Sequence, residues 1–189
     1  MKYNRPQATA SRRISTQVML DTYRDCSGKD RDRAVQRCTE LIGMQPASPF
    51  AYYRRAIAYD AAGEHDKAVS DISEALGPDP QYAIAYNARA WMYFEAKKLT
   101  QALVDVRRSL HLSADDAASL DTRARIYEAL GRREDAIADY KRELALLPEK
   151  HSRFCQHARR WSGSARRLNR SPHGVIQFRE EQCVPSLRR

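Results

Sequence analysis

The sequence predicts an all-α protein built from stacked helical hairpins, and three observations lead to this fold class. The chain repeats itself every 34 residues, small and bulky residues recur at fixed positions of the repeat, and glycine and proline recur where turns are needed. With 189 residues, 42% of them apolar, the chain is long enough for a sizeable core. No apolar run approaches the roughly 18 residues that cross a bilayer, so no membrane insertion is expected.

Three consecutive units of equal length carry the repeat, over residues 49–82, 83–116 and 117–150. Alanine at positions 8 and 20 lets two antiparallel helices approach closely, and bulky residues at positions 4, 11 and 24 fill the surrounding space. Glycine at position 15 supplies the turn between the helices, and proline at position 32 ends the second helix. The residues are Ala56, Ala90 and Ala124 at position 8; Ala68, Ala102 and Ala136 at position 20; Tyr52, Tyr86 and Leu120 at position 4; Tyr59, Tyr93 and Tyr127 at position 11; Ile72, Val106 and Tyr140 at position 24; Gly63 and Gly131 at position 15; and Pro80 and Pro148 at position 32.

The pattern resembles the tetratricopeptide repeat (TPR), whose signature has a large residue at position 4, small ones at 8 and 20, tyrosine at 11 and proline at 32. Residues 15–48 form a more degenerate unit, which retains Ala34 and Pro46 but has Asp25 in place of the tyrosine. The resemblance implies a right-handed α-solenoid of antiparallel helix pairs, the TPR superhelix, with a C-terminal capping helix. We therefore expect a TPR domain over residues 15–150.

The function that this resemblance implies is that of a scaffold or adaptor, which binds a partner peptide or protein in a concave groove lined by the first helix of each repeat. Trp91 is the preferred anchor, because aromatic side chains supply contact area at little entropic cost. The alternative is that Trp91 and Phe94 pack beneath the next repeat or a terminal helix. The predicted groove residues are Phe50, Tyr53, Arg54, Ile57, Asn87, Trp91, Phe94 and Arg125.

Other ligands and activities are disfavoured by the residues present. Chaperone-binding members of the family hold a terminal carboxylate with Lys and Asn in one unit, Asn at position 6 in the next, and Lys and Arg at positions 2 and 6 in the third. This chain departs from that pattern, because position 6 holds Arg54, Ala88 and Thr122, and position 2 holds Phe50, Ile84 and Ala118. No glycine-rich phosphate loop, GxSxG elbow or clustered acid/base pair occurs, so we expect no catalysis and no cofactor. The four cysteines lack the spacing of a metal site, so no metal is expected.

A charged pattern accompanies the repeat. Position 7 is arginine and position 23 is aspartate in the three regular units, and the first unit has the two charges exchanged. We predict an ion pair between the two helices of a repeat or between neighbouring repeats; the alternative is that both side chains are solvated. The residues are Arg55 and Asp71, Arg89 and Asp105, Arg123 and Asp139, and, exchanged, Asp21 and Arg37.

Two cysteines of the first unit leave two interpretations open. Cys26 and Cys38 lie twelve residues apart on opposite arms of a predicted hairpin, where a disulfide would contribute roughly 3 kcal/mol. The segment also resembles the opening of some exported bacterial repeat proteins, which would place the protein in the periplasm. The other interpretation is free thiols in a cytoplasmic protein, in keeping with the lack of a secretory signal at the start of the sequence.

The net charge of +9 belongs to the two ends of the chain. Residues 1–14, expected to be flexible, carry four basic residues and no acid, and residues 151–189 carry nine Arg and two Glu. Residues 151–169 have apolar side chains at helical spacing and are expected to form the capping helix, whereas residues 170–189 are predicted to be disordered. These arginines give the alternative function, binding of RNA or an acidic partner, unless the tail is a frameshifted translation. Self-association through the end faces also stays open.

Overall fold

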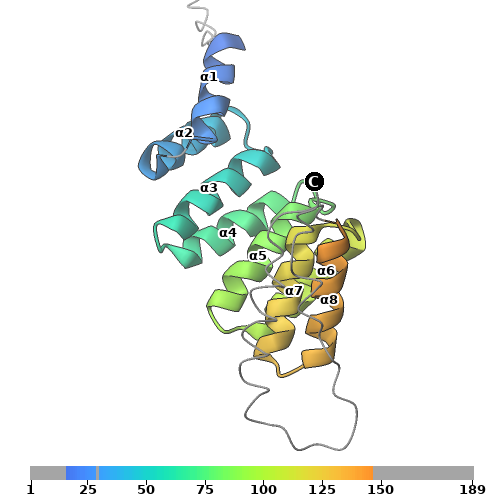
Figure 1. The fold of residues 1–189 in the computed structure, drawn as a ribbon. Helices are drawn as coiled ribbons and strands as arrows, with labels where there is room; N and C mark the ends of the chain where they lie inside the picture. The colour runs from blue at the N-terminus through green and yellow to red at the C-terminus, as the bar shows by residue number, and fades with distance from the viewer. Residues whose placement is uncertain (1–15, 29, 147–189) are drawn as a thin grey trace, which may run out of the picture. The chain divides into compact units, whose positions relative to one another are not determined.

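The computed structural model describes residues 16–28 and 30–146, and within them it contains eight α-helices and no strand (Figure 1). This confirms the predicted all-α class. The chain divides into two compact units, the first ending at Asp79 and the second beginning at Pro80, and each unit holds two helical hairpins. The basic N-terminal segment predicted for residues 1–14, the capping helix of residues 151–169 and the tail of residues 170–189 lie outside the described residues.

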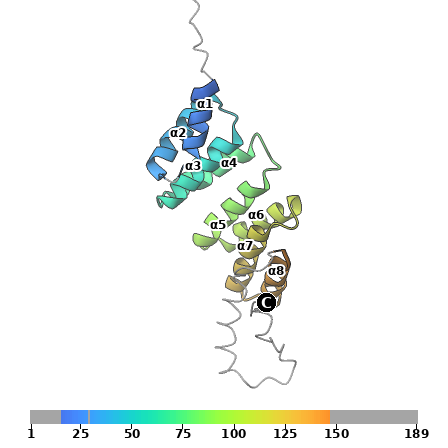
Figure 2. The ribbon, with the colours of Figure 1, turned by 45° about the horizontal axis from the view of Figure 1, so that its top comes forward.

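In the first unit, each helix packs on the next one along the chain, so that two hairpins share one core. Figure 2 shows the same neighbours from a second direction. Polar side chains begin two of the helices, because Asp30 accepts a hydrogen bond from the backbone N–H of Arg33, and Ser48 accepts one from Ala51 just before Pro49. The helices are α1 (Thr16–Cys26), α2 (Arg31–Met44), α3 (Pro49–Ala61) and α4 (His65–Leu76).

In the second unit, the hairpins α5/α6 and α7/α8 pack against each other through α6 and α7, and also through α5 and α7. Asp116 begins α7 by accepting a hydrogen bond from the backbone N–H of Ser119. Each of the four helices starts at the same repeat position as its counterpart in the α3/α4 hairpin. The helices are α5 (Ala83–Glu95), α6 (Leu99–Leu112), α7 (Ala117–Ala129) and α8 (Arg133–Leu146).

The core of each hairpin is built on the small residues of the repeat. The alanines at positions 8 and 20 of the three regular repeats are all fully buried, as are Ile72, Val106 and Tyr140 at position 24. In the second unit one cluster joins Ala90 and Val106 to residues of α7, so consecutive hairpins bury a common core. A single hairpin therefore leaves one apolar face uncovered, which explains why the repeats occur in series.

The turn inside each regular hairpin has one geometry. The backbone N–H at position 16 donates to the carbonyl oxygen of the tyrosine at position 11, which closes the end of the first helix and requires a left-handed residue at position 15. Glycine supplies that conformation in two repeats, but in the middle repeat the residue is Lys97, with φ +60°. The closing bonds are Glu64 to Tyr59 at 2.9 Å, Lys98 to Tyr93 at 2.8 Å and Arg132 to Tyr127 at 2.8 Å.

Replacing Lys97 by glycine is expected to stabilise the fold. Relief of the left-handed strain of a Cβ-bearing residue contributes about 1–2 kcal/mol, and the greater freedom of glycine in the unfolded chain offsets roughly half of it. We expect a net gain of about 0.5–1 kcal/mol in urea unfolding. The control is Lys97→Ala, which removes the charge but keeps the Cβ atom. Equal stability of the glycine and alanine variants would contradict the strain at this turn.

Candidate functional site

The first helices of consecutive hairpins contact each other in both units, α1 with α3 and α5 with α7. In the second unit this contact brings three predicted groove residues together. The rings of Trp91 and Phe94, both on α5, lie with centroids 5.4 Å apart and planes tilted by 40°. The guanidinium carbon of Arg125, on α7, lies 5.3 Å from the centre of the Trp91 ring, which is the geometry of a cation–π contact.

Two further residues complete this arrangement, Asp121 on α7 and Lys97 in the turn after α5. Asp121 holds Arg125 from one turn earlier on α7, accepting hydrogen bonds from Nε at 3.1 and 3.3 Å. The ammonium of Lys97 lies 5.6 Å from the centre of the Phe94 ring. The signal for Lys97 was its place in the column of turn glycines. We call Trp91, Phe94, Lys97 and Arg125 the aromatic–cation cluster.

Asn87 lies one helical turn before Trp91 on α5 and is half-buried. Its Oδ1 atom is enclosed and has no hydrogen-bond partner within the described part of the chain. A ligand reaches this atom only if neighbouring side chains move. Asn87 is therefore near the aromatic–cation cluster in sequence and on the same helix, but it is not an open contact point.

The predicted groove residues of the first unit lie on α3, where two of them are engaged by the first hairpin. The Phe50 ring stacks on Tyr23 of α1, with centroids 4.2 Å apart and planes 9° from parallel. Arg54 donates from Nη2 to the backbone oxygen of Ser27 at 2.9 Å. Burial raises the pKa of Tyr53, with a smaller opposing effect of the neighbouring Arg54 charge. All the predicted residues of this helix are half-buried: Phe50, Tyr53, Arg54 and Ile57.

The arginines at position 7 face the aspartates at position 23 of the same hairpin in the three regular repeats. Each arginine donates through Nε and Nη2 to both carboxylate oxygens, at 2.6–3.0 Å. The aspartate side chains are at most 8% exposed and the arginine side chains at most 21%. The hydrogen bonds raise the pKa of each arginine. The pairs are Arg55 with Asp71, Arg89 with Asp105 and Arg123 with Asp139.

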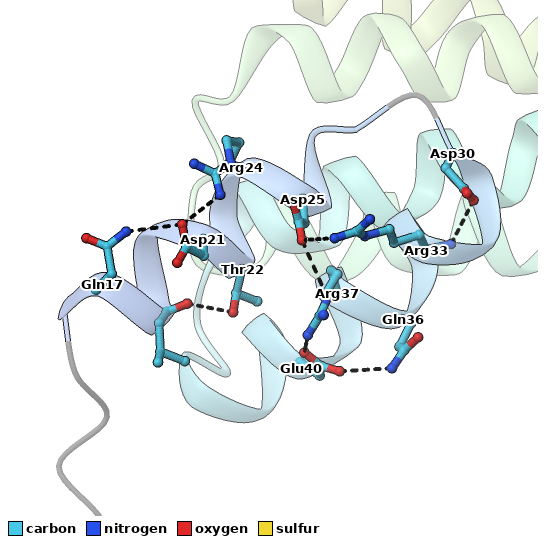
Figure 3. A network of polar contacts seen from close by, with 11 residues as sticks. Gln17, Asp21, Thr22, Arg24, Asp25, Asp30, Arg33, Gln36, Arg37 and Glu40 are labelled. Carbon is cyan, nitrogen blue, oxygen red and sulfur yellow. Dashed lines mark hydrogen bonds and ion pairs between the residues drawn. The ribbon is translucent and has the colours of Figure 1, made fainter.

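The exchanged pair predicted for the first hairpin is not formed, and Figure 3 shows the partners that replace it. Asp21 accepts from Arg24 at 2.7 Å on its own helix. Arg37 donates to Glu40 at 2.7 Å and lies 3.7 Å from Asp25, which also accepts from Arg33 at 2.8 Å. The prediction of an Asp21–Arg37 pair is therefore wrong. The charges do cross the hairpin, but the acidic partner is Asp25, one turn nearer the loop than Asp21.

Cys26 and Cys38 are joined by a disulfide that links the last residue of α1 to the middle of α2. Their Cα atoms are 4.8 Å apart, and both residues are fully buried, in a cluster with Leu41 and Ala51. The bond thus links the two helices of the first hairpin next to the Asp25–Arg37 contact. In the regular repeats the position of Asp25 is a tyrosine, and the position of Arg37 is the aspartate of the Arg/Asp pair.

The described part of the chain shows neither a metal-binding cluster nor a membrane-spanning helix. Residues 16–28 and 30–146 contain no group of three or more His, Cys, Asp or Glu side chains arranged to hold a metal ion. None of the helices described there has the length and apolar character needed to span a membrane.

Comparison with known proteins identifies the repeat. The sequence profile of the tetratricopeptide repeat matches residues 51–82 and 117–146. The chain therefore contains tetratricopeptide repeats. A search of curated proteins finds no match to the chain.

Solved TPR structures have the same fold. MamA is 19% identical over 69% of this chain and 74% of its own, with a TM-score of 0.60. The first TPR of Spaghetti (RPAP3), bound to the HSP90 peptide SRMEEVD, is 24% identical over 63% of this chain and 94% of its own, with a TM-score of 0.58. The first TPR domain of human RPAP3 is 25% identical over 62% of this chain and 92% of its own, with a TM-score of 0.56.

The Arg/Asp pairs of this TPR protein are expected to be energetically coupled. A double-mutant cycle with Arg123→Ala and Asp139→Ala should give a coupling free energy of about 1–3 kcal/mol in urea unfolding, because either single change leaves a sheltered charge unpaired. Arg123→Lys, which keeps the charge but loses the two-pronged geometry, should fall between the wild type and Arg123→Ala. Strictly additive effects of the two alanine changes would rule the coupling out.

The disulfide is expected to stabilise the first hairpin selectively. Peptide mapping without reductant should recover Cys26 linked to Cys38, and reduction should cost about 3 kcal/mol through the greater freedom of the unfolded chain. Hydrogen exchange should then accelerate in α1 and α2, whereas peptides from α5 to α8 serve as the internal control. If both cysteines are alkylated in the unreduced, unfolded protein, the bond is absent.

Proposed function

We propose that this TPR protein is a non-catalytic scaffold that binds a partner polypeptide on the first-helix face of its second unit, with Trp91 as the main anchor. The observation that carries the proposal is the contact of Trp91 with Phe94 on α5 and with Arg125 on α7. Trp and Arg are among the residues that contribute most to the energetics of protein interfaces, where they lie in well-packed sites from which water is excluded. Here both side chains are held in advance by their neighbours.

The second unit is favoured over the first because Trp91 is half-buried beside a cation of α7, Arg125, whereas Phe94 also packs against the core shared by α5, α6 and α7. In the first unit, Phe50 is stacked on Tyr23 and Arg54 is bonded to Ser27. In the second unit, Trp91 and Phe94 are half-buried, and Ile84 on the same helix is 55% exposed. An apolar, partly exposed helix face of this kind suits an extended or helical peptide.

The solved relatives support a peptide as the class of ligand. The Spaghetti (RPAP3) domain was captured with the HSP90 peptide SRMEEVD. That ligand is not carried over to this chain, because position 6 of the regular repeats holds Arg54, Ala88 and Thr122 instead of the carboxylate-binding residues of the chaperone-binding members. The Cys26–Cys38 bond supports an oxidising compartment, such as the periplasm, for the interaction.

The proposal is tested by peptide selection on the full chain. Peptides that bind the wild type are expected to lose at least tenfold in affinity with Trp91→Ala, since truncation of a central anchor costs about 2 kcal/mol or more, and to retain most of it with Trp91→Phe. The matched control is Val104→Ala, which truncates an apolar side chain 63% exposed on the second helix α6. Unchanged affinity of Trp91→Ala, in a variant that melts like the wild type, would exclude the proposed anchor.

A further inference from the structure

The two cations of the aromatic–cation cluster, Arg125 and Lys97, differ from the arginines of α5 and α7 that form sheltered ion pairs. Arg89 on α5 and Arg123 on α7 each give Nε and Nη2 to both oxygens of a sheltered aspartate. Arg125 is bonded to Asp121 through Nε alone. Its two Nη groups have no acceptor among the residues that the structure describes, although the guanidinium is fixed on the Trp91 ring.

Lys97 is the second cation, and its backbone adopts a left-handed conformation that is unfavourable for a residue with a Cβ atom. Its backbone has φ +60°, at the position where two other repeats have glycine. Its ammonium lies over the Phe94 ring and forms no ion pair within residues 30–146. Strain kept at one of several equivalent turns indicates that the side chain is needed there.

The cluster therefore presents two adjoining rings with a cation on each, and within the described part of the chain both cations have N–H groups that are not donated to an acceptor. The Trp91 and Phe94 rings contact each other, so an apolar side chain that covers their edges lies between the two cations. A carboxylate on either side of that apolar side chain would accept from Arg125 or Lys97. Arg125 is well suited to this role, because the carboxylate of Asp121 already orients its guanidinium and little side-chain freedom remains to be lost on binding.

From this geometry we infer that the aromatic–cation cluster recognises an acidic peptide segment in which carboxylates flank a large apolar residue. The inference rests on the proposed function and names the chemistry of its ligand. A peptide fits the cluster better than RNA, because α7 also carries the half-buried carboxylate of Glu128, which accepts from Tyr140 at 2.8 Å. A continuous phosphate backbone would meet this charge, whereas a peptide carries its carboxylates only at chosen positions.

The test uses the full chain and two fluorescein-labelled peptides, DLEDLEDL and its uncharged counterpart NLQNLQNL, followed by fluorescence anisotropy at low and high salt. Lys97→Gly removes one cation and relieves the turn, so it cannot act by unfolding the protein. The double change Asp121→Asn with Arg125→Gln removes the other cation without leaving a buried carboxylate unpaired. Arg107→Gln is the matched control, because Arg107 is exposed on α6 and has no ion pair in the described chain.

The wild type is expected to bind the acidic peptide at least tenfold more tightly than the uncharged one, with affinity falling as salt rises. Lys97→Gly and the Asp121/Arg125 variant should each lose about threefold to tenfold for the acidic peptide only. Arg107→Gln should bind as the wild type does. Since all variants share the basic ends of the chain, any binding by those ends cancels in the comparison.

Three outcomes would overturn the inference. Unchanged affinity in both cation variants would indicate that the acidic peptide binds at the ends of the chain. Equal affinity for the two peptides would indicate an apolar site without charge selectivity. Preferential binding of an oligouridylate that weakens with Lys97→Gly would make the ligand RNA. The proposed function is judged separately: it stands if Trp91→Ala weakens the uncharged peptide, and it fails if Trp91→Ala weakens neither peptide.

Discussion

The close approach of the two helices in each hairpin is the constraint on which the rest of the structure depends. Alanine at positions 8 and 20 lets the helix backbones come near enough for the arginine at position 7 to bind the aspartate at position 23 through both Nε and Nη2. A larger residue at either alanine position would separate the helices and break a sheltered ion pair as well as the packing. Packing and electrostatics therefore fail together in this fold, and this makes the hairpin an all-or-none unit.

One pair of positions shows how a repeat tolerates different chemistry when the geometry is kept. Positions 12 and 24 face each other across the hairpin, and they are joined by a disulfide in the first repeat, Cys26 to Cys38. In the last repeat the same positions are Glu128 and Tyr140, joined by a hydrogen bond that the Tyr140 hydroxyl donates, and burial raises the pKa of this hydroxyl. The first hairpin, which lacks the Arg/Asp pair and the tyrosine of position 11, thus receives a covalent link at the place where another repeat has a polar one.

The sequence predicted the all-α fold well because the column pattern reports helix packing directly: equivalent helices begin at equivalent positions. The pairing of Asp21 with Arg37 failed for a physical reason. Column alignment assumes that the first hairpin has the geometry of the others, but Asp25 stands where they have tyrosine, and it offers Arg37 a carboxylate one turn nearer than Asp21. The role of Lys97 was also out of reach, since a residue's backbone conformation and its distance from a ring require coordinates.

The candidate site depends on which side chains are already engaged by the packing of the fold. The Phe50 ring stacks on Tyr23, and Arg54 donates a hydrogen bond to the backbone oxygen of Ser27. The arginines at position 7 are paired with aspartates. In the second unit, Trp91 is half-buried on α5 beside Phe94, and two cations lie over these rings, Arg125 on α7 and Lys97 in the turn after α5. A helix-repeat protein binds other chains with the groups that its own packing does not consume. In this chain those groups combine aromatic surface with positive charge, and a ligand that matches them must offer apolar and acidic groups side by side.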